Sequence, residues 1–219
     1  MVGNERLTVL AGAVLLVLIV VELVTVPTLR ALQSVHVFIG VLLAGPLAVK
    51  LGSTGYRFLR YYTGSPAYVR KGPPRLPLRV LAPLLLATTL VVIGSGIGLV
   101  VTGPGHPGPL LLVHGMSTLL WLPLLAIHLF AYLWQVPRSL ADDWSNHPAE
   151  YTPGRGLRLG VNLGAGLCGA LAAILVLPVA APWSAWITTT GNGPGPFLLI
   201  TGMLVVALAL LAAQLLRWR

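Results

Sequence analysis

Charged residues are scarce in this sequence, and the scarcity excludes most soluble proteins. Only 9% of the 219 residues are Asp, Glu, Lys or Arg, whereas 56% are hydrophobic. A soluble domain carries roughly 25% charged residues. Because so few polar side chains cannot coat a soluble core, we expect lipid to surround most of the surface. The net charge of +9 does not indicate nucleic-acid binding, because the basic residues lie between apolar runs and not on one folded face.

Cysteine is nearly absent as well, which limits the available redox and metal chemistry. Cys168 is the one cysteine of the chain and lies inside an apolar run, where we expect a small buried apolar side chain. One cysteine forms no intrachain disulfide, no C-x-x-C-H haem-attachment motif and no zinc knuckle. Any metal or haem chemistry must therefore depend on histidine.

Long apolar runs are what the sequence does contain. A membrane-crossing helix needs about 20 predominantly apolar residues, and six runs meet this length. The first is too long for the apolar region of a signal peptide, so we expect it to remain as a helix. The prediction is an all-α, polytopic membrane protein with a single membrane domain over residues 1–219 and six transmembrane helices. These are Leu7–Val26, Ala31–Val49, Leu78–Val101, Leu110–Trp134, Leu157–Ala180 and Phe197–Leu216.

The basic residues predict the orientation of the six helices. With the N-terminus inside, the outer loops hold only Arg30, and the other thirteen Lys and Arg residues lie on the inner side. Because inner loops of membrane proteins are enriched in Lys and Arg, this bias predicts cytoplasmic N- and C-termini in the plasma membrane. The inner basic residues are Arg6, Lys50, Arg57, Arg60, Arg70, Lys71, Arg75, Arg79, Arg138, Arg155, Arg158, Arg217 and Arg219.

The connecting segments are short, with one exception. The outer loops Thr102–Pro109 and Gly191–Pro196 are rich in Gly and Pro and are too short to fold as domains. The inner loop over residues 51–77 interleaves tyrosines with arginines, which favours a segment lying on anionic lipid headgroups. Docking of a cytoplasmic partner is the alternative. Within the helices, Pro46, Pro83 and Pro123 are expected to cause kinks.

Three histidines lie inside the predicted helices, and two of them match in depth. An ionisable side chain at membrane depth is costly unless satisfied, so it is a functional candidate. His36 lies about five residues, and His114 about four residues, inside the outer ends of their helices; at 1.5 Å per residue both reach roughly 6–8 Å below the outer boundary. Two imidazoles at one depth are what bis-histidine haem ligation requires. Alternatively, they are unrelated residues bonded to carbonyl groups. His106 and His147 are expected to be solvated loop residues.

His128 adds a spacing that extends this pattern. It follows His114 by fourteen residues, which places it on the same helix face about 21 Å further along the axis. This spacing resembles the histidine pairs of membrane-embedded b-type cytochromes, whose four-helix bundles hold haems within membrane oxidoreductases. The resemblance covers Leu7–Trp134, so residues 1–134 would form the haem-binding part and 157–216 two further helices. It departs at Lys50, which stands fourteen residues after His36 and is expected to reach the inner interface.

The resemblance implies haem b as cofactor, with His36 and His114 as axial ligands of one outer haem. A second haem on His128, with Lys50 or no second ligand, is the alternative; otherwise His128 bonds a carbonyl group or water. Arg30 could pair with a haem propionate. Glu22, the only acid within a span, pairs with Arg30 or accepts a proton from a quinol.

The sequence thus predicts a protein that transfers electrons between membrane quinone and a redox partner. We expect a subunit of an oxidoreductase rather than a stand-alone enzyme. No phosphate-binding glycine loop is present for a nucleotide or flavin domain. Two alternatives remain open: a haem-free transporter subunit, in which the histidines and Glu22 form a proton or metal pathway, and a cofactor-free membrane anchor.

Overall fold

The computed structural model describes residues 1–73, 76–133, 135–145, 152–190 and 195–217. Within these ranges every regular element is a helix, which confirms the all-α prediction. The elements are α1 (Val2–Thr25), η1 (Val26–Thr28), α2 (Leu29–Leu42), α3 (Ala44–Tyr62), α4 (Pro66–Lys71), α5 (Leu76–Thr102), α6 (Leu110–Tyr132), α7 (Gln135–Trp144), α8 (Arg155–Ala180), α9 (Pro182–Thr190) and α10 (Gly195–Arg217).

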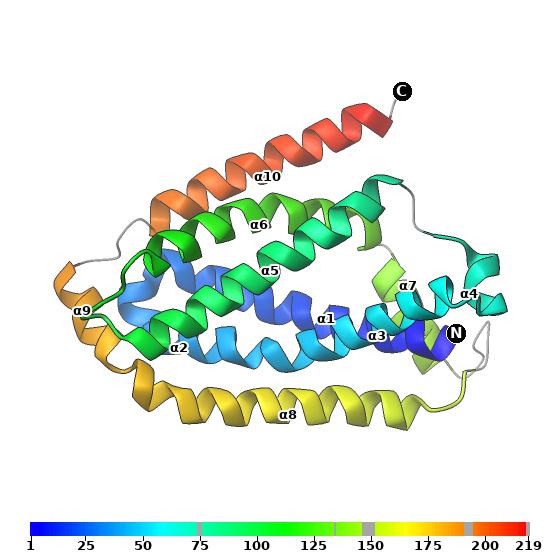
Figure 1. The fold of residues 1–219 in the computed structure, drawn as a ribbon, viewed down its shortest axis with the longest axis horizontal. Coiled ribbons are helices and arrows are strands. Elements are labelled where there is room, and N and C mark those ends of the chain that lie inside the picture. The colour runs from blue at the N-terminus through cyan, green and yellow to red at the C-terminus, as the bar shows by residue number, and fades with distance from the viewer. Residues whose placement is uncertain (74–75, 134, 146–151, 191–194, 218–219) are drawn as a thin grey trace.

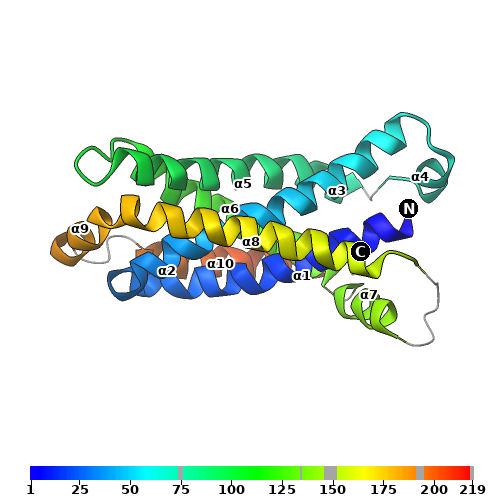
Figure 2. The same cartoon turned by 90° about the horizontal axis from the view of Figure 1, so that it is seen from below.

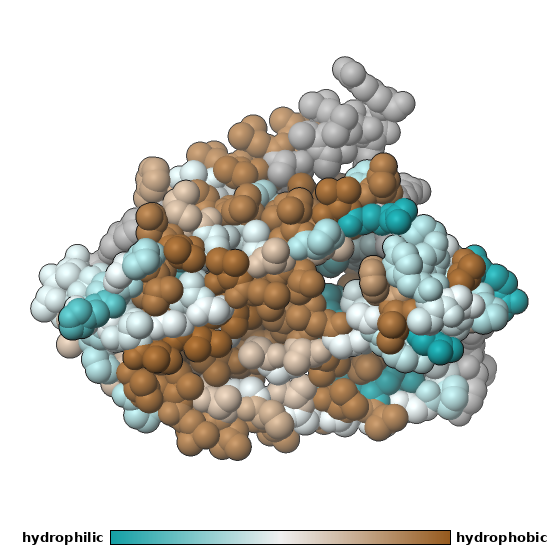
Figure 3. Space-filling model, viewed as in Figure 1, coloured by the Kyte–Doolittle hydropathy of each residue, from teal (hydrophilic) through white to brown (hydrophobic). Residues whose placement is uncertain are grey.

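Four helical segments of the described chain are long and apolar enough to cross a membrane. They are Val2–Tyr62, Leu76–Thr102, Leu110–Tyr132 and Arg155–Ala180. Their surfaces agree with a lipid environment, because apolar side chains cover the middle of the molecule and hydrophilic ones gather toward its ends (Figure 3). A soluble monomer rarely exposes so large an apolar area.

The first of these segments is not one straight helix. Pro27 lies in the 3-10 turn η1, and there the chain turns back, so that α1 lies beside α2 and α3 (Figure 1). Proline suits this position because its fixed φ and missing N–H are tolerated at the first turn of a helix. The irregular backbone of Leu32 (φ −117°, ψ 18°) adds a second bend before the regular part of α2.

The predicted effect of Pro46 is confirmed as a break between α2 and α3. Proline lacks an N–H and clashes with the carbonyl group four residues earlier, which here belongs to Leu42, the last residue of α2. Pro83 and Pro123, in contrast, lie within α5 and α6, which continue through them as helices.

The inner segment 51–77, predicted as a loop, is largely helical. α3 continues to Tyr62 because no proline interrupts it after Pro46, and it ends at Thr63 and Gly64, where the φ of Gly64 is +76°. α4 then begins at Pro66. The short helices α7 and α9 were not predicted either, because neither is long enough to stand out as a span.

α8 packs against α2 and α3, whereas α10 packs against α6 (Figures 1 and 2). The α8 contact requires glycine on both sides. A Cβ on Gly169 would lie 2.6 Å from the carbonyl oxygen of Leu42, and a Cβ on Gly45 would overlap the carbonyl group of Ala165. Cys168, the neighbour of Gly169, is exposed on the other side of α8, so the prediction that it is buried was wrong. The helix rotation that buries Gly169 turns Cys168 outward.

A buried ionic cluster joins three helices at the end of the bundle where the basic residues gather. Arg6 of α1 binds both Asp142 and Asp143 of α7, and its Nη1 lies 2.7 Å from Asp143 Oδ1. Arg158 of α8 donates to the same Oδ1 at 2.6 Å. Only 8% of the Asp143 side chain and 5% of the Arg158 side chain are exposed. α1 begins and α10 ends toward this basic end (Figure 1).

Candidate functional site

His36 of α2 and His114 of α6 lie next to each other. Their ring centroids are 6.4 Å apart, and the ring planes are almost perpendicular at 89°. Equal depth on two helices predicted this proximity, and the structure confirms it. The role of the two rings as ligands remains a prediction.

The hydrogen bonds of His114 determine which ring nitrogen carries its proton. Nδ1 lies 3.0 Å from the carbonyl oxygen of Val92 and 3.1 Å from Oγ of Ser95, both in α5. A carbonyl oxygen only accepts, and Ser95 donates its own proton to Val91 O at 2.6 Å. Nδ1 is therefore the N–H, and Nε2 of His114 carries the lone pair of a neutral imidazole.

His36 follows the same arrangement with partners from α1. Its Nδ1 lies 2.8 Å from Oγ1 of Thr25 and 3.1 Å from Oε1 of Glu22. Thr25 donates its proton to the carbonyl oxygen of Glu22 at 2.6 Å, so its oxygen accepts from His36. Nε2 of His36 is then also the nitrogen that keeps a lone pair.

The separation of the two rings fits one metal ion held between them. Metal–nitrogen bonds to histidine are about 2 Å long. Because a ring nitrogen lies about 1 Å from the imidazole centroid, two rings on opposite sides of one ion have centroids about 6 Å apart. Among the described residues, no group of three or more His, Cys, Asp and Glu side chains could hold a metal ion. An ion between the rings would therefore have the two imidazoles as its protein donors, the number that bis-histidine haem ligation needs.

Glycines lie against His114 and against Glu22. A Cβ on Gly96 would lie 3.2 Å from Cε1 of His114, and a Cβ on Gly40 would lie 3.2 Å from Oε1 of Glu22. A Cβ at either position would be closely packed, and the neighbouring side chain would have to shift by a few tenths of an ångström to admit it. Small residues also allow close helix packing in membranes, so the glycines make room at the site without identifying its ligand.

Glu22 and Arg30, the other acid and base of the predicted site, have different surroundings. Glu22 contacts His36 through Oε1, while its Oε2 is buried and has no hydrogen-bond partner among the described residues. Arg30 is exposed on the first turn of α2. Pairing of Arg30 with a haem propionate stays a prediction.

His128 and Lys50 lie apart from the outer pair, toward the basic end. The ring of His128 packs on Tyr132 with centroids 5.0 Å apart. Lys50 Nζ lies over Gly12 of α1, 2.8 Å from where a Cβ would stand, and it is near enough to His128 for electrostatic interaction. Among the histidines that the structure describes, none lies beside His128, and a second, inner haem stays a prediction.

The predictions for the two loop histidines, His106 and His147, have different outcomes. His106 is exposed in the turn between α5 and α6, as expected. His147 lies outside the described residues.

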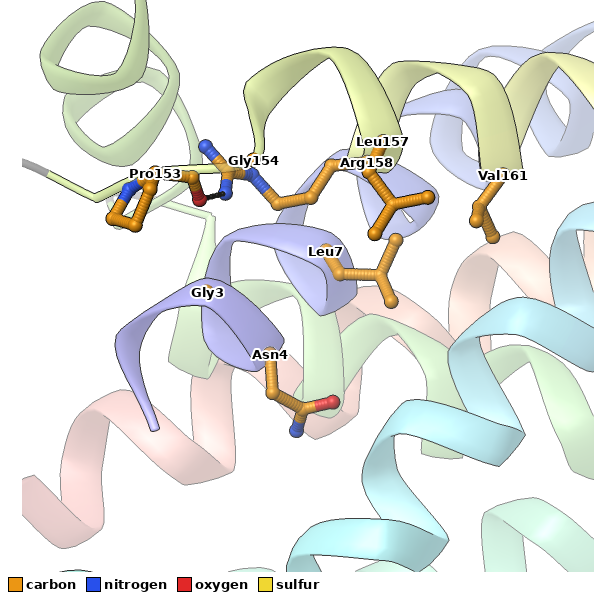
Figure 4. A pocket seen from close by; sticks show the side chains of 8 residues that line it. All are labelled: Gly3, Asn4, Leu7, Pro153, Gly154, Leu157, Arg158 and Val161. Carbon is orange, nitrogen blue, oxygen red and sulfur yellow. Dashed lines mark hydrogen bonds between the residues drawn. The ribbon is translucent and has the colours of Figure 1, made fainter.

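A pocket of about 260 Å³ lies at the basic end, between the first turns of α1 and α8 (Figure 4). Leu7 and Leu157 face each other across it, and Arg158 runs along its wall to the carbonyl oxygen of Pro153, at 2.8 Å. None of the four histidines within the described ranges lines this pocket. It is therefore separate from the His36–His114 site.

Sequence reasoning missed the residues that orient the two histidines. Thr25, Ser95 and the carbonyl group of Val92 hold the rings. One signal was available for the side chains, since hydroxyl residues within apolar spans at the depth of a histidine are its natural partners. The carbonyl partner, that of Val92, has no sequence signal, because every residue carries a carbonyl group.

Comparison with known protein families, with curated proteins and with solved structures finds no match for this chain.

Proposed function

We propose that His36 and His114 ligate the iron of one haem b, and that the protein transfers electrons between membrane quinone and a redox partner as a subunit of a membrane oxidoreductase. The observation that carries the proposal is the ring separation of 6.4 Å. On both rings Nδ1 is hydrogen-bonded and Nε2 keeps its lone pair. Two oriented, neutral imidazoles from different helices meet the demands of bis-histidine ligation.

In this proposal the protein positions the ligands and excludes water. Thr25 and Val92 fix the ring orientations from outside, which is the usual task of residues that bond the free nitrogen of a ligating histidine. Gly96 leaves space against His114. A bound haem would supply one-electron redox chemistry.

The proposal includes six membrane crossings, with N- and C-termini in the cytoplasm and the site toward the outer side of the plasma membrane. Two features support the count beyond the four apolar segments. The first segment turns back at η1, so that it would cross twice, and α10 has 23 residues. The gathering of basic residues at one end supports the orientation.

A haem-free proton pathway is the second candidate function. The contact of Glu22 with His36, together with the unpartnered buried Oε2, favours it, because intramembrane carboxylate and imidazole groups form proton relays. A relay, like a cofactor-free anchor, would give a colourless protein. An absorption spectrum therefore separates both from the haem proposal.

Replacement of the ligands tests the proposal. His36→Ala and His114→Ala each remove one axial bond, so we expect loss of the low-spin haem spectrum or loss of haem from the purified protein. His106→Ala and His128→Ala are matched controls and should keep the spectrum. If both ligand variants keep an unchanged low-spin spectrum, His36 and His114 do not ligate the haem and have a structural role.

A further inference from the structure

An arm at the basic end, formed by residues 55–71, carries a large exposed apolar stripe. It comprises the last turns of α3 and the whole of α4 (Figure 2). Phe58, Leu59 and Tyr62 share one face of α3, and they are 64%, 58% and 61% exposed. Phe58 and Tyr62 stack with centroids 4.5 Å apart. This face continues a helix that begins inside the apolar segment, so it extends the lipid-facing surface.

The same arm carries positive charge that no described carboxylate neutralises. The sequence contains no Asp or Glu between Glu22 and Asp142. The described acids at this end are already engaged, Glu5 by Lys71 and the Asp142–Asp143 pair by Arg6 and Arg158. In the described part of the chain, the arginines of the arm are therefore left without an acidic partner. They are Arg57, Arg60 and Arg70.

The arm is held in place by its own contacts. Tyr68 is buried and meets Tyr56 edge to face, with centroids 6.2 Å apart. Arg60 donates to Ser65 Oγ at 3.1 Å across the turn, and Lys71 ties α4 to Glu5 of α1. The stripe and its arginines thus keep a fixed position at the end of the bundle, which lowers the entropic cost of binding a ligand there.

We propose that the arm binds the phosphate groups of anionic phospholipids. Phe58, Leu59 and Tyr62 would enter the headgroup region, where aromatic side chains are enriched. Arg57, Arg60 and Arg70 would bind the phosphates by charge-assisted hydrogen bonds. Lipid is the favoured occupant because the apolar stripe and the arginines lie together on an extension of the lipid-facing helix, as in interfacial amphipathic helices. This inference does not depend on the haem proposal.

A fluorophore at the end of α3 tests the inference in the full chain. We would attach a polarity-sensitive dye to a Thr63→Cys variant, in a Cys168→Ala background, and reconstitute the protein in phosphatidylcholine nanodiscs with or without phosphatidylglycerol. We expect phosphatidylglycerol to shift the emission to the blue and to slow quenching by acrylamide. High salt should reverse most of this change, because the attraction is electrostatic.

Two triple variants provide the matched comparison. Arg57→Gln/Arg60→Gln/Arg70→Gln should lose the response to phosphatidylglycerol. Arg79→Gln/Arg138→Gln/Arg155→Gln removes the same charge from the same end, outside the arm, and should retain it. Circular dichroism establishes that both are folded. Equal emission in the two lipid mixtures, or equal loss of response in both triple variants, would overturn the inference. A dye that stays exposed to water in every lipid mixture would also overturn it, and an acidic protein would then be the ligand expected at this surface.

Discussion

At the scale of single residues, Nδ1 of His36 has a nearer acceptor, Thr25 Oγ1 at 2.8 Å, and a second one, Glu22 Oε1 at 3.1 Å. Thr25 is buried, accepts from Nδ1 of His36 and donates to its own helix. For His114 the nearer acceptor is a carbonyl oxygen, Val92 O at 3.0 Å, and the hydroxyl oxygen of Ser95 is the second one at 3.1 Å. The two rings should therefore respond differently to loss of their hydroxyl partners.

Thr25→Val keeps the side-chain shape and removes the nearer acceptor of His36, leaving Glu22 Oε1. We expect haem affinity to fall by about 10–100-fold, the usual range for loss of a residue that orients a metal-binding histidine. Ser95→Ala should have a smaller effect because Val92 O remains. Haem titration of the apoprotein measures both. Thr88→Val is the control, since Thr88 bonds only its own helix in α5. An affinity of Thr25→Val equal to that of Thr88→Val would contradict the assigned orientation.

The proximity of the two histidines could be predicted from sequence, whereas their partners could not. Depth follows directly from counting residues along apolar runs, so His36 and His114 were matched. Which α5 residue faces His114 depends on the rotation and tilt of two helices, and close packing by Gly96 and Gly98 sets these. The same limit explains why Cys168 was placed inside.

At the scale of helices, the crossing of α8 over the α2–α3 break depends on glycine. Gly169→Ala puts a methyl group against Leu42 O, where only 2.6 Å is available, and we expect a loss of about 1–3 kcal/mol of stability from overpacking. Gly164→Ala is the control in the same helix, because nothing lies within 4 Å of a Cβ there. Thermal unfolding in detergent compares the two. Equal melting temperatures would show that the helices do not approach this closely.

The Arg6–Asp143–Arg158 cluster fastens α7 to α1 and α8. Burial raises the pKa of Asp143, but hydrogen bonds and charge from Arg6 and Arg158 outweigh it, so its pKa lies below the usual value. A depressed pKa stabilises the fold above the unfolded-state value of about 4, and this contribution is lost as the pH falls through the folded-state pKa.

Asp143→Asn should therefore lower stability at neutral pH by about 3 kcal/mol, because Arg158 stays buried without its carboxylate. The variant should also lose part of the pH dependence below about pH 4. Glu5→Gln breaks the more exposed pair with Lys71 and should cost less than about 1 kcal/mol. Melting temperatures over a pH series test this. Parallel pH profiles for the wild type and Asp143→Asn would contradict the role of the cluster.

Helix boundaries were predictable where proline and glycine mark them, but not elsewhere. The turn between Thr102 and Leu110 falls where the sequence places it. α3 passes the expected end at Val49 because helix formation continues until Gly64, whatever the polarity of the residues. Hydropathy locates the membrane-crossing part of a helix and not the helix itself.

At the scale of the whole molecule, the middle of the surface is apolar and its ends are more hydrophilic (Figure 3). Composition predicted this arrangement, because 56% hydrophobic residues leave few polar groups for a soluble surface. The histidine pair and the basic arm lie at opposite ends of the bundle. The proposed haem site and the proposed lipid contact are thus independent features of one membrane protein.

The central claim is tested most directly by the haem content of the purified wild-type chain. We expect about one haem b per chain, because one pair of facing imidazoles is present among the described residues. Its spectrum should be low-spin in both the oxidised and the reduced state. A ratio near two would mean that His128 also ligates iron. A protein purified after expression with an adequate haem supply that contains no haem, and binds none when haem is added, would contradict the account.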